Sequence, residues 1–151
     1  MKVPFNYLNY QFKDKKKYFN EWTKLINSSE FTLGPYVKKF EKLFAKYVGL
    51  KHCISTNNGT DALILSLKSI GVKKGDEVIT VCNSFYATAG AIDACGAKII
   101  FVDSDDRYQI NVDKIEKAIT KKTKVILPVH WAGASPNMYK IMKIAKKHKL
   151  K

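Results

Sequence analysis

The chain of 151 residues has little of several features that mark particular protein classes. It has only three cysteines and no Cys-x-x-Cys pair, so neither a disulfide framework nor a zinc or other metal site is indicated. No apolar run approaches the roughly 18 residues that cross a bilayer, and the first residues lack the apolar segment of a signal peptide. We therefore expect a cytoplasmic protein with no membrane partner.

The cysteines themselves are expected to be structural. Cys53, Cys82 and Cys95 each lie in or beside a short apolar segment, where a thiol behaves as a small hydrophobic side chain. A catalytic thiol needs an activating base, and none is adjacent in the sequence. We predict that all three are core residues.

Arginine is nearly absent: Arg107 is the only one, although the formal net charge of the chain is +14. Arginine is the usual bidentate reader of phosphate and guanine, and the lysines are spread over polar helix faces and turns. This pattern favours a solvated, lysine-rich surface and no nucleic-acid partner. A basic nucleic-acid module is the alternative, and DNA retention that weakens with salt would support it.

What the chain does contain is enough apolar sequence, 46%, for a domain with a core. Residues 1–50 are predicted to form a lead-in with two amphipathic helices, in which 1–9 is extended. The helices cover 12–26 and 35–48, the second starting at Pro35 and stopping at Gly49. The first is rich in aromatic residues, which need a surface of the same domain or of a partner subunit.

Short apolar strands and helices alternate from Lys51 to the end. The expected strands are 52–55, 77–81, 98–102 and 124–129, and the expected helices are 60–70, 85–95, 112–119 and 136–150. Repeated strand–helix–strand order implies right-handed crossovers and a mostly parallel sheet with helices on its faces. Residues 51–151 are therefore predicted to be an α/β domain.

The turn that follows the first expected strand has the composition of an anion site. Asn58, Gly59 and Thr60 precede an apolar helix, whose first N–H groups lack partners within the helix and favour a negative charge. Asn is also a good helix cap whatever its function, so the local pattern leaves a phosphate site and a plain cap equally open. Parallel sheets bind ligands beyond the carboxyl ends of their strands, where this turn lies.

A series of short motifs resembles one known family. They are Pro4-Phe5-Asn6, Phe31 to Pro35, Asn58 to Leu63, Gly75 to Ile79, Ser84 to Ala89, Gly96-Ala97, Phe101 to Asp103, Ala118 to Thr120 and Pro128 to Gly133. In order and spacing they resemble the N-terminal part of the DegT/DnrJ/StrS sugar aminotransferases, which are pyridoxal-phosphate enzymes of fold type I. The resemblance implies a three-layer αβα fold, here the first part of the large cofactor-binding domain.

The resemblance also implies roles for individual residues. Gly59 and Thr60, with Asn58 beside them, would hold the phosphate of pyridoxal 5'-phosphate. Phe85 would stack on its pyridine ring, although core packing is the alternative for this side chain, and His130 would line the site.

Other segments have looser expected roles. Thr32 and Gly34 would contact substrate from a loop that approaches the active site in a homodimer. Asn83 and Ser84 are expected beside the ring and could offer hydrogen bonds, whereas Asp103 is expected to have a structural role in a turn.

The implied activity is transfer of an amino group, with glutamate as donor, to a nucleotide-linked keto sugar, as in the synthesis of amino sugars for polysaccharides or secondary metabolites. In the family the Schiff-base lysine and the acidic partner of the pyridinium nitrogen lie downstream, so no catalytic residue is assigned and the 151 residues alone are expected to be inactive. The alternatives are a sugar dehydratase, another fold type I enzyme, or a non-catalytic relative.

Overall fold

The computed structural model describes residues 3–151, which divide into two compact units. The first unit ends at Ser55 and the second spans Thr56–Lys151. Each unit is described separately below. Among the described residues, no helix combines the length and the apolar character needed to cross a membrane.

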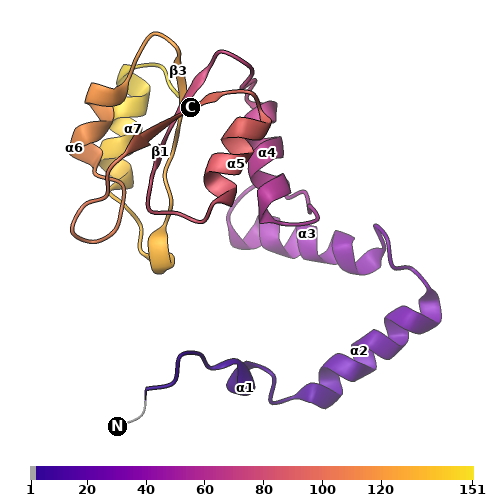
Figure 1. Cartoon of the computed structure of the whole chain (residues 1–151). Helices are drawn as coiled ribbons and strands as arrows, with labels where there is room; N and C mark the ends of the chain where they lie inside the picture. Colours follow the sequence, from indigo (N-terminus) through magenta and orange to yellow (C-terminus); the bar gives the residue numbers. More distant parts are fainter. Residues whose placement is uncertain (1–2) are drawn as a thin grey trace. The chain divides into compact units, whose positions relative to one another are not determined.

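The first unit is helical (Figure 1). Its helices are α1 (Leu8–Gln11), α2 (Lys15–Ser28) and α3 (Pro35–Tyr47). The Asp14 side chain caps α2 by accepting a hydrogen bond from the main-chain N–H of Lys17. The prediction of an extended segment over 1–9 is wrong at its end, because α1 begins at Leu8; its first two residues lie outside the described part.

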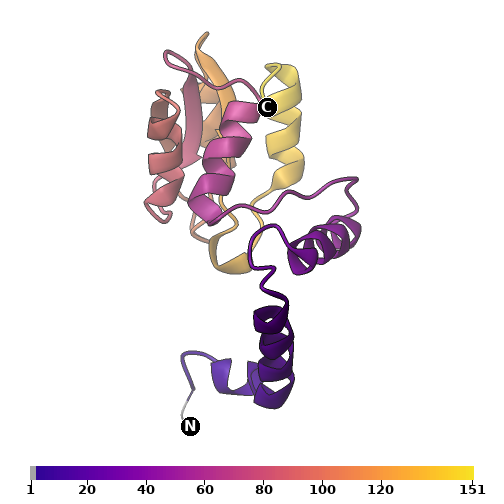
Figure 2. The same ribbon diagram turned by 90° about the vertical axis from the view of Figure 1, so that its right-hand side faces the viewer.

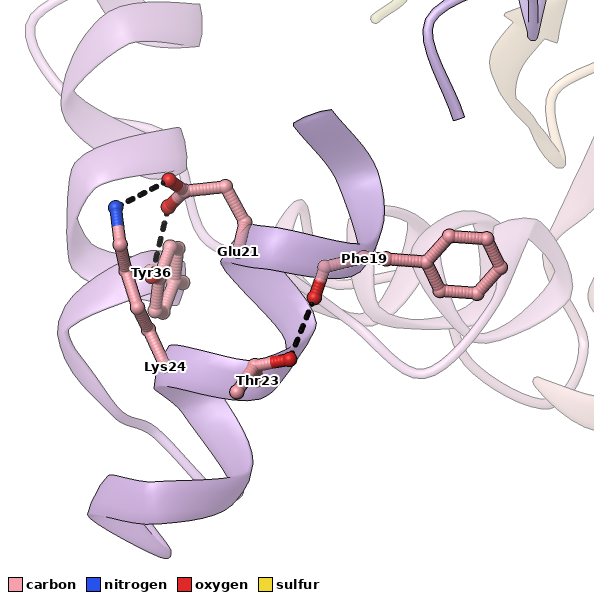
Figure 3. A network of polar contacts seen from close by, with 5 residues as sticks. All are labelled: Phe19, Glu21, Thr23, Lys24 and Tyr36. Carbon is pink, nitrogen blue, oxygen red and sulfur yellow. Dashed lines mark hydrogen bonds and ion pairs between the residues drawn. The ribbon is translucent and has the colours of Figure 1, made fainter. Parts of the chain in front are cut away.

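One carboxylate links two helices of the first unit. Glu21 on α2 accepts hydrogen bonds from Lys24 at 2.6 Å and from the hydroxyl of Tyr36 on α3 at 3.0 Å (Figure 3). On the same helix Thr23 donates to the carbonyl of Phe19, four residues earlier. These contacts are exposed, so they orient the helices without forming a core.

The second unit contains a sheet of three parallel strands, β1 (Glu77–Val81), β2 (Lys98–Val102) and β3 (Thr123–Leu127), in the order β2-β1-β3. Its helices are α4 (Gly59–Ser69), α5 (Ala87–Ala94), α6 (Val112–Ile115, followed by a 3-10 turn at Glu116–Ala118) and α7 (Met138–Lys147). The predicted mostly parallel sheet is confirmed.

Successive residues of the central strand point to opposite faces of the sheet and build two cores. Val78 and Val125 pack with α4 and α5, whereas Ile79 and Ile126 pack with α6 and α7. Figures 1 and 2 show the helices on the two faces of the sheet. The result is the three-layer αβα arrangement.

The predicted strand 52–55 does not form. These residues have no strand conformation, Ile54 is 82% exposed, and the N–H of Ser55 donates to the Glu41 carboxylate instead of a ladder partner. A strand needs a neighbour, and no described segment pairs with these residues: β1 is paired on both sides, the outer edge of β3 pairs with the main chain of Lys151, and β2 pairs with β1 alone. The apolar pattern of these residues is typical of a strand, but a local pattern does not show whether another segment is available to pair with it.

The cysteines divide into three environments. Cys95 is buried beside α4, as predicted, whereas Cys53 is half-buried and Cys82 is exposed. The prediction of a core position is therefore wrong for Cys82. It comes directly after the last residue of β1, where the chain leaves the sheet and its side chain leaves the core.

Candidate functional site

A hollow of about 500 Å³ lies at the carboxyl ends of β1 and β3, in the second unit. Three segments line it: the start of α4, the connection from β1 into α5, and the segment that follows β3. The lining residues are Asn58, Gly59, Thr60, Leu63, Ser84, Phe85, Ala87, Thr88, Val129, His130, Trp131 and Ala132. The fold thus places the hollow where parallel sheets bind ligands.

Asn58 is a helix cap. Its Oδ1 accepts from the N–H of Asp61 at 2.9 Å, and its Nδ2 donates to the Asp61 carboxylate at 3.1 Å. The hydroxyl of Thr56 donates to the Asn58 carbonyl at 3.0 Å, which fixes the approach to the helix. Asp61 is turned toward Asn58 and does not line the hollow.

The cap does not use the hydrogen-bond donors of the next two residues. Among residues 3–151 the main-chain N–H groups of Gly59 and Thr60 and the hydroxyl of Thr60 have no hydrogen-bond partner. All three belong to residues that line the hollow at the positive end of the α4 dipole. The cap and the anion site are therefore compatible, because they use different donors of the same turn.

The surrounding packing does not require a glycine at position 59. Gly59 has no left-handed backbone conformation, and a Cβ added to it would meet no atom within 4 Å. Glycine gives up some helix stability at this position without relieving a clash. Without a side chain, the main chain at this position is left uncovered where it lines the hollow.

Phe85 extends from the connection between β1 and α5. It is 64% exposed, so the alternative of core packing is wrong, and its ring lies 4.2 Å from that of Tyr86 between centroids. Beside it the hydroxyls of Ser84 and Thr88 form a hydrogen bond of 2.7 Å across the first turn of α5. An aromatic face and two hydroxyls therefore share this wall.

The third wall is a tight turn at Trp131–Gly133. Ala132 has φ of 51° and Gly133 has φ of 81°, both in the left-handed region. The turn is closed by hydrogen bonds from Gly133 N–H to the His130 carbonyl and from Ala134 N–H to the Trp131 carbonyl. An alanine in this conformation is held by its surroundings against its own preference.

Charge is supplied to the hollow by main-chain dipoles. Within the described part of the chain its lining includes no lysine, arginine, aspartate or glutamate, and no cluster of three or more possible metal ligands is found. Asp103, after β2, lies outside the lining: a hydrogen bond from Lys114, with another from the N–H of Ser104, lowers the pKa of its carboxyl. Its contacts are those of a turn.

The structure brings together the five residues that the sequence predicted to bind a cofactor, Asn58, Gly59, Thr60, Phe85 and His130. Their binding roles stay predictions. Asn83 is not among the lining residues and donates to the carbonyl of Tyr108 at 3.4 Å.

The two predicted substrate contacts, Thr32 and Gly34, lie in the first unit, between α2 and α3. A Cβ at Gly34 would clash with the carbonyl oxygen of Glu30, so this glycine has a local structural reason. Their role toward substrate stays a prediction.

Sequence reasoning did not name all the walls of the hollow. It assigned no site role to Leu63, Ala87, Thr88, Val129 or Ala132. Most are small or apolar and carry no sign of function in the sequence. Trp131 could be recognised, since a large aromatic residue at a strand end next to a histidine is of the kind that a site uses.

Comparison with known proteins places this geometry in a family. A sequence model described as the DegT/DnrJ/EryC1/StrS aminotransferase family matches residues 13–151. The chain belongs to this family. A crystal structure of NtdA from Bacillus subtilis with bound cofactor PMP superposes on this chain with a TM-score of 0.91 and 40% sequence identity, over 99% of this chain and 35% of that one.

Two relatives are similar to the chain over most of its length. A 3-oxo-glucose-6-phosphate:glutamate aminotransferase of Bacillus subtilis is 44% identical over 87% of this chain and 30% of its own length. A pleiotropic regulatory protein of Geobacillus stearothermophilus is 43% identical over 99% of this chain and 41% of its own length. This DegT-family chain thus spans less than half of the proteins that it resembles.

Proposed function

We propose that this DegT-family chain forms the phosphate and ring-face part of a pyridoxal 5'-phosphate site in a sugar aminotransferase. The observation that carries the proposal is the open hollow at the start of α4, where the donors of Gly59 and Thr60 have no partner among the described residues and Phe85 presents an exposed ring. Phosphate suits such a helix start.

The residues that line the hollow suit different parts of the cofactor. The N–H groups of Gly59 and Thr60 and the Thr60 hydroxyl would hold the phosphate, while Asn58 keeps the turn in shape through its cap. Phe85 would cover one face of the pyridine ring and exclude water from it. His130 would border the same space from the end of β3. When bound, the cofactor supplies an electron-withdrawing ring that stabilises negative charge on a substrate carbon.

The proposed reaction of the whole protein is transfer of an amino group from glutamate to a keto sugar carried on a nucleotide, within a homodimer. The name of the Bacillus subtilis relative includes a keto sugar phosphate and glutamate, which supports the donor and a keto sugar as acceptor. The nucleotide is supported by the name of a 41% identical relative, the dTDP-3-amino-3,4,6-trideoxy-alpha-D-glucose transaminase of Micromonospora megalomicea. The hollow has no lysine among its described lining residues, so we propose that these 151 residues bind the cofactor reversibly without transferring an amino group.

Titration of the purified chain with pyridoxal 5'-phosphate, followed by calorimetry, tests the cofactor site. We expect saturable binding that inorganic phosphate competes for, and Thr60→Val should weaken it about tenfold, the loss of one hydrogen bond to a charged group. Thr23→Val, which removes a hydroxyl in the first unit, is the matched control and should leave the affinity unchanged.

Two results would contradict the proposal. One is the absence of saturable binding, and the other is equal weakening by both threonine variants. Borohydride treatment adds an independent readout: stable attachment of the cofactor to one particular lysine of this chain, lost in Thr60→Val, would refute the part of the proposal that denies it amino transfer.

A regulatory relative is the second candidate, because the chain is 43% identical to a pleiotropic regulatory protein over 99% of its length. In that case the hollow would bind its ligand as a sensor. Amino transfer by the longer protein that contains this chain, measured with glutamate and a keto sugar, separates the two: turnover supports the enzyme, and ligand binding without turnover supports the sensor.

A further inference from the structure

Gln109 is a buried polar residue just outside the hollow. It lies between β2 and α6, is 2% exposed, and is not part of the lining. Burying an amide is unfavourable unless its hydrogen bonds are replaced. Its contacts therefore indicate what keeps it there.

The amide of Gln109 points its donor at two carbonyl groups. Nε2 lies 3.3 Å from the carbonyl oxygen of Trp131 and 3.4 Å from that of Arg107, while Oε1 has no partner among the described residues. Turning the amide over would place its oxygen against two carbonyl oxygens. The chemistry of the partners thus fixes the orientation, although it leaves Oε1 unpaired.

The loop that carries Gln109 is closed on itself. The Asp105 carboxylate accepts from the N–H of Arg107 at 2.9 Å and from that of Gln109 at 3.0 Å, and the Asp105 N–H donates to the Gln109 carbonyl at 2.7 Å. Ser104 and Ile110 add a bridge at the base of the loop. These hydrogen bonds therefore hold the backbone that carries the Gln109 side chain in one conformation.

The Gln109 side chain contacts the wall of the hollow that the turn at Trp131–Gly133 forms. The Trp131 carbonyl belongs to the peptide that joins Trp131 to Ala132, and Ala132 is the residue with φ of 51°. This carbonyl also accepts from the N–H of Ala134 at 2.9 Å, so both its lone pairs are used. A bond to this oxygen fixes the plane of the peptide and, with it, the turn that places Trp131 and Ala132 at the hollow.

We propose that Gln109 is a positioning residue for the cofactor site: it holds the Trp131–Ala132 peptide from the loop after β2 and so keeps the third wall of the hollow in its binding shape. The proposal rests on the proposed function for its effect on pyridoxal phosphate, but its effect on the wall is independent of any ligand.

The test uses the full chain with Trp22→Phe, which leaves Trp131 as the single tryptophan. Gln109→Met has nearly the same size but no donor, and it should increase acrylamide quenching of Trp131 fluorescence and raise the Kd for pyridoxal 5'-phosphate about 3- to 10-fold. Asn83→Leu removes another side-chain bond to this loop, from Asn83 to the Tyr108 carbonyl, and should change neither readout.

A rescue separates positioning from general damage. Glycine adopts φ above zero without strain, so adding Ala132→Gly to Gln109→Met should restore the Kd to within about twofold. A general loss of packing would not respond to this change. If Gln109→Met does not fold, as judged by circular dichroism, Gln109→Asn, which keeps the amide but is too short to reach Trp131, replaces it.

The outcomes are distinct. Unchanged quenching in the folded Gln109 variant, or an equal effect of Asn83→Leu, overturns the inference. A raised Kd that Ala132→Gly fails to rescue also overturns it. If the parent chain binds no pyridoxal 5'-phosphate, the proposed function fails, while altered Trp131 quenching and its reversal by Ala132→Gly still support the role of Gln109.

Discussion

The two units of the chain use their apolar side chains in opposite ways. In the second unit both faces of the sheet are covered by helices, and the central strand is buried along its whole length. In the described part of the first unit Ala45 alone is buried, and large aromatic residues such as Phe19, Trp22 and Phe40 are exposed.

The difference separates two sources of helix stability. Each fully buried aliphatic side chain of the second unit contributes about 1.5–3 kcal/mol, whereas a side-chain pair on a helix surface contributes about 0.2–0.5 kcal/mol. The first unit depends on such local contacts, including the pair of Lys24 with Glu21 and the edge-to-face rings of Phe19 and Trp22. The pattern of apolar residues alone does not distinguish these cases.

The largest effect should come from shortening the same residue type in each unit. Ile92 on α5 is 0% exposed and Ile26 on α2 is 61% exposed. Ile92→Ala should lower the free energy of unfolding by about 2–5 kcal/mol, because it removes buried atoms and leaves a cavity. Ile26→Ala should change it by less than about 0.5 kcal/mol. Urea unfolding measures both.

Because the two substitutions are chemically identical, their difference reports burial alone. A loss of more than about 1 kcal/mol on Ile26→Ala would contradict the comparison. It would mean that α2 packs its apolar face in solution.

A smaller effect is expected from the helix caps. Asn58→Ala should destabilise the second unit by about 1 kcal/mol, since the N–H of Asp61 loses its acceptor. Asp14→Ala removes the cap of α2, whose bond to Lys17 is 3.4 Å long, and should increase amide exchange within α2 without moving the main urea transition.

Asn58→Asp is the informative variant of this pair. Aspartate keeps the cap but places a negative charge next to the proposed phosphate site. We expect some loss of stability, because a carboxylate oxygen replaces the amide group that donates to the Asp61 carboxylate, and we expect weaker binding of pyridoxal 5'-phosphate. Unchanged affinity would argue that no anion binds at this turn.

The smallest effect concerns two exposed carboxylates. Hydrogen bonds from His148 and then Lys147 lower the pKa of Glu116 in the second unit to about 2, from its ordinary 4.5. The stabilisation is therefore present above pH 4.5 and is lost as the pH falls toward 2. Glu116→Gln should flatten the dependence of Tm on pH between 4.5 and 2.

Glu21 is the counterpart in the first unit, where hydrogen bonds from Lys24 and Tyr36 also lower the carboxyl pKa. Because its helix has little buried surface, Glu21→Gln should leave the Tm profile unchanged over the same pH range. Thermal melts by circular dichroism check both variants, and a flattened profile for Glu21→Gln alone would reverse the expected order.

Much of the second unit could be predicted from the sequence. Apolar periodicity located β1, β2 and β3, and the composition around Asn58 located the start of α4. These features are local, so the residues that cause them are neighbours in the chain. The strand expected at 52–55 was wrong because pairing depends on another segment, which no local pattern supplies.

The candidate site was predictable to the extent that its residues are unusual. Gly59 and Thr60 stand out at the start of a helix and Phe85 follows a strand, whereas Leu63 and Ala132 look like any apolar residues. Gln109 was missed because a glutamine in a polar loop is expected to be exposed. Only the folded chain shows that it is buried and bonded to Trp131.

The parallel order of the sheet also determines how the second unit must fold. No neighbouring strands are joined by a tight turn: β1 pairs with β2 across α5, and it pairs with β3 only after α6 has also been passed. Each pairing closes a long loop, and the chain loses entropy before the contacts between the strands can form. The sheet therefore has no local nucleus and a high contact order. The chain that carries this site therefore belongs among the slower-folding topologies, and its strand edges stay open during folding for longer than those of a hairpin.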